Sequence, residues 1–140
     1  TVYMRSNDFL WGASAVNIFN NTFIQEYFAH ILKMQIGNYY HFSNNFHYYE
    51  EQRSTIEKLA NITKIQDEGF LYNKSFKTLK EFDTKIIELN ELENKIRKGG
   101  NIDNVNFQDD FFNDWIKVLY AYNSKRKIKF INPILNKIFN

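Results

Sequence analysis

The spacing of apolar residues predicts a long helix early in the chain. Over residues 16–34, apolar side chains recur every three or four positions and leave only a narrow polar strip, which is the pattern of a helix. Ser14 is suited to cap the start of this helix, which should run to about Gln35, and Gly37 stands where a glycine often follows a helix end. Because a helix this apolar is usually buried on most sides, we expect it to lie in the core.

Segments rich in β-forming residues stand on either side of this helix. Thr1–Met4 alternates polar and apolar residues and predicts the end of a strand, which the polar run 5–8 should close as a turn. Asn38–Tyr49 is dense in aromatic residues and is interrupted by Ser43-Asn44-Asn45. It predicts one or two extended segments, the second from Phe46 to Tyr49.

The remaining chain has mainly helical periodicity. Helices are predicted over residues 50–62, 75–98 (ended by Gly99-Gly100) and 107–123, with a loop over 64–74 and a short last helix opening at Pro133. The predicted fold class is therefore α+β, with a partial sheet and a long buried helix, followed by a mainly α-helical C-terminal half. We place the division between residues 1–62 and residues 63–140.

Composition and charge restrict the classes of function. The 140 residues suit one domain, with or without a helical extension. The chain has no cysteine, so it supplies no disulfide, no thiolate zinc ligand and no cysteine nucleophile. A net charge of +2 is too small to indicate nucleic acid or an anionic membrane as a partner. The mean hydropathy is −0.52, and we find neither a membrane-spanning run nor an export signal, so we expect a cytoplasmic protein.

The polar run after the first strand contains a candidate phosphate-binding pair. The Arg5 guanidinium can bind a phosphate through two parallel hydrogen bonds, and the Ser6 hydroxyl can add another. The alternative is an ordinary turn in which Arg5 and Asp8 form a solvated pair.

A second candidate pair follows the aromatic segment. On an extended chain His47 and Tyr49 point to the same face, where their polar tips could hydrogen-bond a sugar hydroxyl. The alternative is that both rings belong to a packing layer between strands. His41 and His47, with Glu50 and Glu51 nearby, match no spacing of metal ligands, so no metal site is expected.

Asn17 is a polar residue in the first turn of the apolar helix. A buried amide needs partners, because an unsatisfied buried polar group costs about 1–3 kcal/mol. Asn17 either caps its own helix or presents its amide to the 3,4 edge of a pyrimidine, where it can pair with uracil in one orientation and with cytosine in the other.

Taken together, these elements resemble thymidylate synthase and the related deoxypyrimidine-monophosphate hydroxymethylases. The resemblance rests on a Met-Arg-Ser-Asn-Asp run at residues 4–8, a glycine four residues beyond it, and an asparagine opening a long apolar helix with a glycine at its end. A His-x-Tyr sequence then follows about forty residues after the arginine. The resemblance covers roughly residues 1–51 and implies a thymidylate-synthase-like partial sheet.

The resemblance implies that six residues hold a deoxypyrimidine monophosphate. They are Arg5 and Ser6 at the 5′-phosphate, Asp8 (through its backbone amide) and Asn17 at the base, and His47 and Tyr49 at the deoxyribose 3′-hydroxyl. Members of the family are homodimers, and an isolated piece of sheet would leave unpaired edges. We therefore expect a homodimer, or a preceding segment that completes the core.

The sequence also departs from the family pattern. The family's nucleophilic cysteine has no counterpart here, and the interval from Asp8 to Asn17 is one residue longer than usual, which leaves Val16 at the strict register. The portion that closes over the folate is not recognisable after about residue 52. We expect the C-terminal part of a thymidylate-synthase-like enzyme that binds dUMP or dCMP for one-carbon transfer from methylenetetrahydrofolate to C5. The alternative is a non-catalytic module derived from that fold, which binds a nucleotide or, through its helices, another protein.

Overall fold

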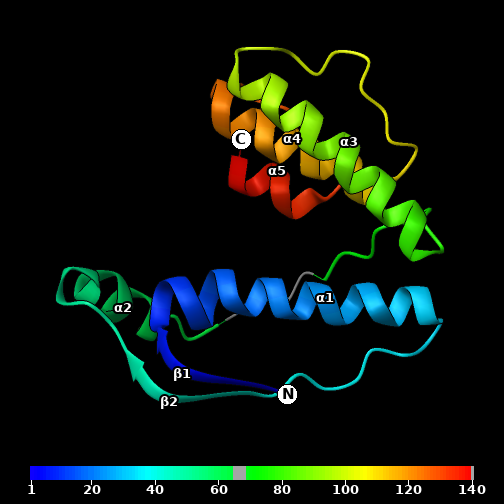
Figure 1. The fold of residues 1–140 in the computed structure, drawn as a ribbon. Coiled ribbons are helices and arrows are strands. Elements are labelled where there is room, and N and C mark those ends of the chain that lie inside the picture. Colours follow the sequence, from blue (N-terminus) through cyan, green and yellow to red (C-terminus); the bar gives the residue numbers. More distant parts are fainter. Residues whose placement is uncertain (65–68, 140) are drawn as a thin grey trace. The chain divides into compact units, whose positions relative to one another are not determined.

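Residues 1–64 and 69–139 are described by the computed structural model, and they fall into two units, residues 1–66 and 67–140. Unit 1 holds a small parallel sheet and unit 2 is helical (Figure 1). This confirms the α+β class and the mainly helical C-terminal half. The assignment of residues 1–62 to a nucleotide-binding part and of 63–140 to a separate region stays a prediction. The loop expected over 64–74 lies partly outside the described residues.

Unit 1 is a strand–helix–strand unit. Its elements, in chain order, are β1 (Val2–Asp8), the π-helix η1 (Phe9–Val16), α1 (Asn17–Leu32), β2 (His41–His47), the 3-10 turn η2 (Glu50–Gln52) and α2 (Arg53–Ala60). The strands are parallel and pair in register from Val2 with His41 to Asp8 with His47. Parallel strands need a crossover connection, and α1 provides it (Figure 1).

The polar run 5–8 is strand, not the predicted turn. Ser6 pairs with Asn45 and Asp8 with His47, so β2 supplies a partner where the sequence favoured a bend. The same pairing carries β2 unbroken through residues 43–45, where we expected an interruption. Pairing between strands outweighs the low strand propensity of asparagine, aspartate and serine here.

Both predicted ends of the long helix are wrong. The helical segment begins after Asp8, whose carboxylate accepts a hydrogen bond from the Trp11 backbone N–H at 2.6 Å, so Ser14 is not its cap. It ends at Leu32, because Lys33 adopts the left-handed conformation (φ 55°) and the Met34 N–H donates back to the Ala29 carbonyl at 2.9 Å. That closing geometry usually takes a glycine, and Gly37 lies four residues beyond it.

Much of the apolar surface of α1 is exposed within the described residues. The helix buries only Tyr27 and Ala29, whereas Phe19 is 60% exposed and Leu32 is 62% exposed. The burial expected for this helix is therefore not found within the described residues.

Unit 2 contains three helices, α3 (Leu79–Arg97), α4 (Asp110–Ser124) and α5 (Pro133–Phe139). Its core is built on three phenylalanine rings, Phe76, Phe82 and Phe112, whose centroids lie 5.1 to 6.1 Å apart. Pro133 opens the last helix as predicted.

Two buried carboxylates fasten the loops of unit 2 to α4. Asp109 caps α4 by accepting from the Phe112 N–H at 3.0 Å, and its other oxygen accepts from the Ser75 N–H at 2.6 Å. Asp114 accepts from the N–H groups of Ile131 and Asn132, each at 2.8 Å. Because each oxygen of these buried groups has a donor, the segments before and after α4 are held in place without a larger apolar core.

Candidate functional site

The carboxyl ends of β1 and β2 bring together residues far apart in sequence. Ser6 and Asp8 end β1, and His47 ends β2 directly opposite Asp8 in the register. The Ser6 hydroxyl lies 3.5 Å from Nδ1 of His47. The carboxyl ends of parallel strands are where open α/β sheets commonly bind ligands. Three of the six predicted residues therefore meet at one edge of the sheet.

Tyr49 joins this edge through the turn that follows β2. Its ring contacts that of His47 edge to face, with centroids 5.5 Å apart and planes at 90°. The backbone of Tyr49 is fixed by Gln52, whose N–H donates to the Tyr49 carbonyl at 2.9 Å and whose side-chain oxygen accepts from the Tyr49 N–H at 3.4 Å. The predicted pair thus forms a rigid aromatic corner with two polar tips.

Arg5 lies on β1 immediately before Ser6, and its side chain is exposed. Among the described residues its guanidinium has neither a hydrogen-bond partner nor an ion-pair partner, and the solvated pair with Asp8 is not formed. All five of its N–H donors are open to a ligand.

The side chain of Asp8 forms a hydrogen bond with the backbone at the start of η1. One carboxylate oxygen caps η1, and the other, Oδ2, is buried without a hydrogen-bond partner among the described residues. Its side chain therefore fixes the turn from strand to helix, and its backbone N–H is the group that the family resemblance assigns to the base.

The π-helix explains the long interval between Asp8 and Asn17. In η1 the Asn17 N–H donates to the Gly12 carbonyl five residues back, one residue more than in an α-helix. This wider turn accommodates the extra residue. As a result Val16 is 46% exposed, while Asn17 donates from Nδ2 to the Asn7 side-chain oxygen at 3.0 Å and to the Met4 sulfur at 3.6 Å.

Sequence reasoning missed a chain of hydrogen bonds behind Asn17. Asn7, only 2% exposed, donates from Nδ2 to Nε2 of His41 at 2.7 Å, and Nδ1 of His41 lies 2.7 Å from the Tyr39 hydroxyl. Buried Gly12 makes room for it, since a Cβ there would lie 1.8 Å from the Asn7 oxygen. In the sequence, Asn7 is the unspecified residue between Ser6 and Asp8, and His41 was considered only as a possible metal ligand. The signal that could have indicated these hydrogen bonds is the presence of Asn7, Gly12 and Asn17 within eleven residues.

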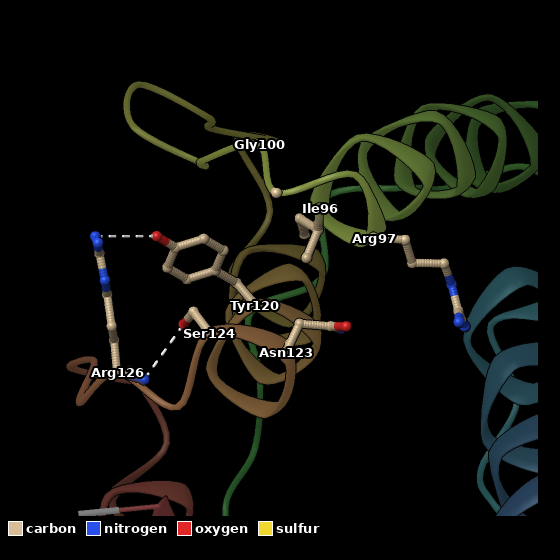
Figure 2. Close-up of a pocket in the computed structure, with 8 residues that line it drawn as sticks. Ile96, Arg97, Gly100, Tyr120, Asn123, Ser124 and Arg126 are labelled. Carbon is tan, nitrogen blue, oxygen red and sulfur yellow. Dashed lines mark hydrogen bonds between the residues drawn. The ribbon is translucent and has the colours of Figure 1, made fainter.

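A pocket of about 360 Å³ lies in unit 2, where α3 and α4 end, and Figure 2 shows the residues that line it. Arg126 donates to the Tyr120 hydroxyl at 3.4 Å, whereas Arg97 extends away from it and pairs with Glu93. The two guanidinium groups do not converge, so they cannot bind one anion together. The candidate site therefore remains at the carboxyl ends of β1 and β2.

Within residues 1–64 and 69–139 no three His, Asp or Glu side chains gather in a way that could hold a metal ion. No helix in the same ranges is long and apolar enough to cross a membrane.

Comparison with known proteins shows the family of the chain. The family model for thymidylate synthase matches residues 1–102, well beyond the roughly fifty residues in which the sequence alone showed a resemblance. Over 62 residues the chain is 39% identical to a deoxyuridylate hydroxymethyltransferase of Pseudomonas phage M6; the match spans 44% of this chain and 18% of that protein. No solved structure matches significantly. Because the family match covers most of the sequence, the chain belongs to the thymidylate synthase family.

Proposed function

We propose that unit 1 binds a deoxypyrimidine monophosphate, dUMP or dCMP, at the carboxyl ends of β1 and β2. The observation that carries this proposal is the contact between Ser6 and His47, which are 41 residues apart in sequence and meet at the sheet edge. A nucleotide monophosphate has three separate recognition groups, and the residues predicted from the sequence offer a candidate for each.

The phosphate is assigned to Arg5 and Ser6. An exposed guanidinium without a partner has no bond to break before it takes up a phosphate, and it can form two parallel charge-assisted hydrogen bonds. The Ser6 hydroxyl, which faces His47, can donate to a third oxygen.

The sugar is assigned to His47 and Tyr49. Their edge-to-face contact holds both polar tips at one corner, and the Gln52 bonds fix the backbone there. A 3′-hydroxyl is both donor and acceptor, so it suits a neutral imidazole beside a phenol.

The base is assigned to Asn17 and to the Asp8 backbone N–H. Among the described residues the side-chain oxygen of Asn17 accepts no hydrogen bond, so it is open to the 3,4 edge of a pyrimidine. The name of the phage relative supports uracil as the base.

The chemistry of the family is folate-dependent one-carbon transfer, and methylenetetrahydrofolate would supply the carbon destined for C5. We assign no residue of this chain to the folate. The chain also has no cysteine to attack the pyrimidine. We therefore assign to the residues of this chain the binding of the nucleotide, and not the attack on the pyrimidine.

The alternative function is a nucleotide-binding module without turnover. Both functions require the same site, so binding is the first measurement and turnover with methylenetetrahydrofolate is the second. Nucleotide binding without turnover supports the module, and turnover excludes it.

Calorimetric titration of dUMP and dCMP into the wild type and Arg5→Ala tests the site. Loss of a charge-assisted phosphate contact costs about 1.5–3 kcal/mol, so we expect binding to weaken about tenfold to a hundredfold. Arg97→Ala is the matched control, since it removes a largely exposed guanidinium from unit 2 and should leave affinity unchanged. Equal affinity of wild type and Arg5→Ala would contradict the assignment.

A further inference from the structure

The amide of Asn17 is held in one orientation by the hydrogen bonds behind it. Its nitrogen has two hydrogens, and the two acceptors nearest to them are the Asn7 oxygen at 3.0 Å and the Met4 sulfur at 3.6 Å. The carbonyl oxygen is left for a ligand. Whether that orientation is fixed depends on Asn7, because a free Asn7 amide could turn over and let Asn17 turn with it.

Asn7 is fixed in turn by His41. Its oxygen accepts from Asn17, and its nitrogen lies 2.7 Å from Nε2 of His41. An amide nitrogen only donates, so Nε2 must be the acceptor, and the proton of a neutral imidazole then sits on Nδ1. That proton points to the Tyr39 oxygen, 2.7 Å away. Every hydrogen bond in the chain therefore runs in one direction, from Asn17 through Asn7 and His41 to Tyr39.

Reversing the direction of these hydrogen bonds would cost free energy, because the groups in the middle of the series are buried away from water. Turning the Asn7 amide alone would set its nitrogen against that of Asn17, and Asn7 is only 2% exposed, so no water could repair the mismatch. Turning both amides together would also require the His41 proton to move, and it would set the Asn17 oxygen against the Met4 sulfur, which is an acceptor. Gly12 packs against the Asn7 oxygen so closely that no side chain fits between them.

We propose that Asn7, His41 and Tyr39 are positioning residues that make the site select uracil over cytosine. The inference rests on the proposed function. Uracil carries a hydrogen on N3, which donates to the fixed Asn17 oxygen. Cytosine presents an unprotonated N3 there, and its preferred pairing needs the amide reversed. The three residues touch neither base nor sugar and act only through Asn17.

The test is the ratio of the dissociation constants for dCMP and dUMP. We expect the wild type to bind dUMP at least about tenfold more tightly, since one hydrogen bond and one lone-pair repulsion separate the bases. His41→Leu, which removes the acceptor for Asn7, should bring the ratio close to one. His41→Gln, whose side-chain oxygen can accept in place of Nε2, should restore much of the preference.

Tyr39→Phe is the second variant, because it removes only the hydroxyl oxygen that accepts from His41 and keeps the ring. It should lower the ratio, whereas Tyr40→Phe, at the adjacent exposed tyrosine, should not. If both Tyr39→Phe and His41→Leu bind the two nucleotides with the wild-type ratio, these residues do not set the base preference.

Nitrogen-15 NMR of the nucleotide-free protein separates this inference from the proposed function. The neutral His41 ring should carry its proton on Nδ1, and the Asn7→Leu variant should lose that preference. A proton on Nε2 overturns the directed chain even if nucleotides bind. If the tautomer is as expected but the wild type binds neither nucleotide, the proposed function fails and the selectivity inference fails with it.

Discussion

The absence of a Cβ at Gly12 is what allows two amides and an imidazole to bond in a row. Alanine there would place its Cβ 1.8 Å from the Asn7 oxygen and 3.1 Å from the Asn17 nitrogen. The Asn7 amide would have to leave both partners.

We therefore expect Gly12→Ala to lower the free energy of unfolding by about 1–3 kcal/mol, the usual cost of overpacking a buried position. Urea denaturation followed by circular dichroism measures it. Gly37→Ala is the control, since a Cβ at Gly37 meets nothing within 4 Å. Equal losses in the two variants would mean that the gap at Gly12 does not matter.

Asparagine side chains do more in this structure than their abundance in the sequence suggests. Asn113 accepts from the N–H of Phe107 at 2.8 Å, and Asn136 accepts from the N–H of Phe130 at 2.9 Å. Both phenylalanines are buried. Each asparagine holds the backbone six residues before it, a contact that depends on the path of the intervening loop and that composition cannot reveal.

At the scale of elements, the sequence pattern predicted α3, α4, α5 and both strands among the described residues, but it placed the end of β1 and both ends of the long helix of unit 1 wrongly. The run 5–8 was misjudged because its fate depends on β2, which lies more than thirty residues downstream. The π-helix was equally hidden, since nothing local distinguishes it from an α-helix. Ser6, His47 and Tyr49 could be proposed as candidates because the chemistry of Arg5-Ser6 and of His47-x-Tyr49 is visible over a few neighbouring residues. Asn7 and His41 were not predicted, because the role of each depends on the hydrogen bond between them, which the sequence does not show.

The segment that precedes α3 is tied to α4 by Tyr72, whose hydroxyl donates to the buried Asp114 carboxylate at 3.2 Å. Burial, followed by the Asp114 charge and its hydrogen bond, raises the pKa of Tyr72 from 10.0 to about 12, although a hydrogen bond with Asn132 opposes the shift. The folded state thus keeps the phenol proton longer than the unfolded state does.

Stability should consequently be independent of this group below about pH 10 and fall as the pH rises from about 10 to 12, because only the unfolded chain then releases the proton. Urea denaturation across that range measures the slope. Tyr72→Phe should flatten it, and Tyr122→Phe, at an exposed tyrosine of unit 2, should not. An unchanged slope in Tyr72→Phe would show that this phenol does not contribute.

At the scale of the whole molecule, unit 1 exposes apolar side chains on both its helix and its sheet. On α1, Phe28 is 51% exposed, and on β2, Phe46 is 58% exposed. A shallow, open and mainly apolar surface also lies along residues 14–22, at the start of α1. Patches of this kind usually mark a contact with another protein chain, and the family resemblance implies a second copy.

We therefore expect the chain to dimerise, and we expect Phe28→Lys to shift it toward the monomer in sedimentation velocity runs over a concentration series. Tyr122→Lys, which places the same charge at a 69% exposed position of unit 2, serves as the control and should leave the dimer intact. A wild type that stays monomeric at every concentration would contradict this expectation.

The hydroxyl of Ser6 and the imidazole of His47 lie on different strands of the sheet, which has two strands in the described part of the chain. Such a pair of strands is a weak structure by itself. A ligand that binds both side chains would hold the two strands in register. A shift of one strand by a single residue would turn His47 to the opposite face of the sheet, and the ligand would lose that contact. Ligand binding and the correct register of the two strands should therefore stabilise each other, so that the ligand strengthens the structure that binds it.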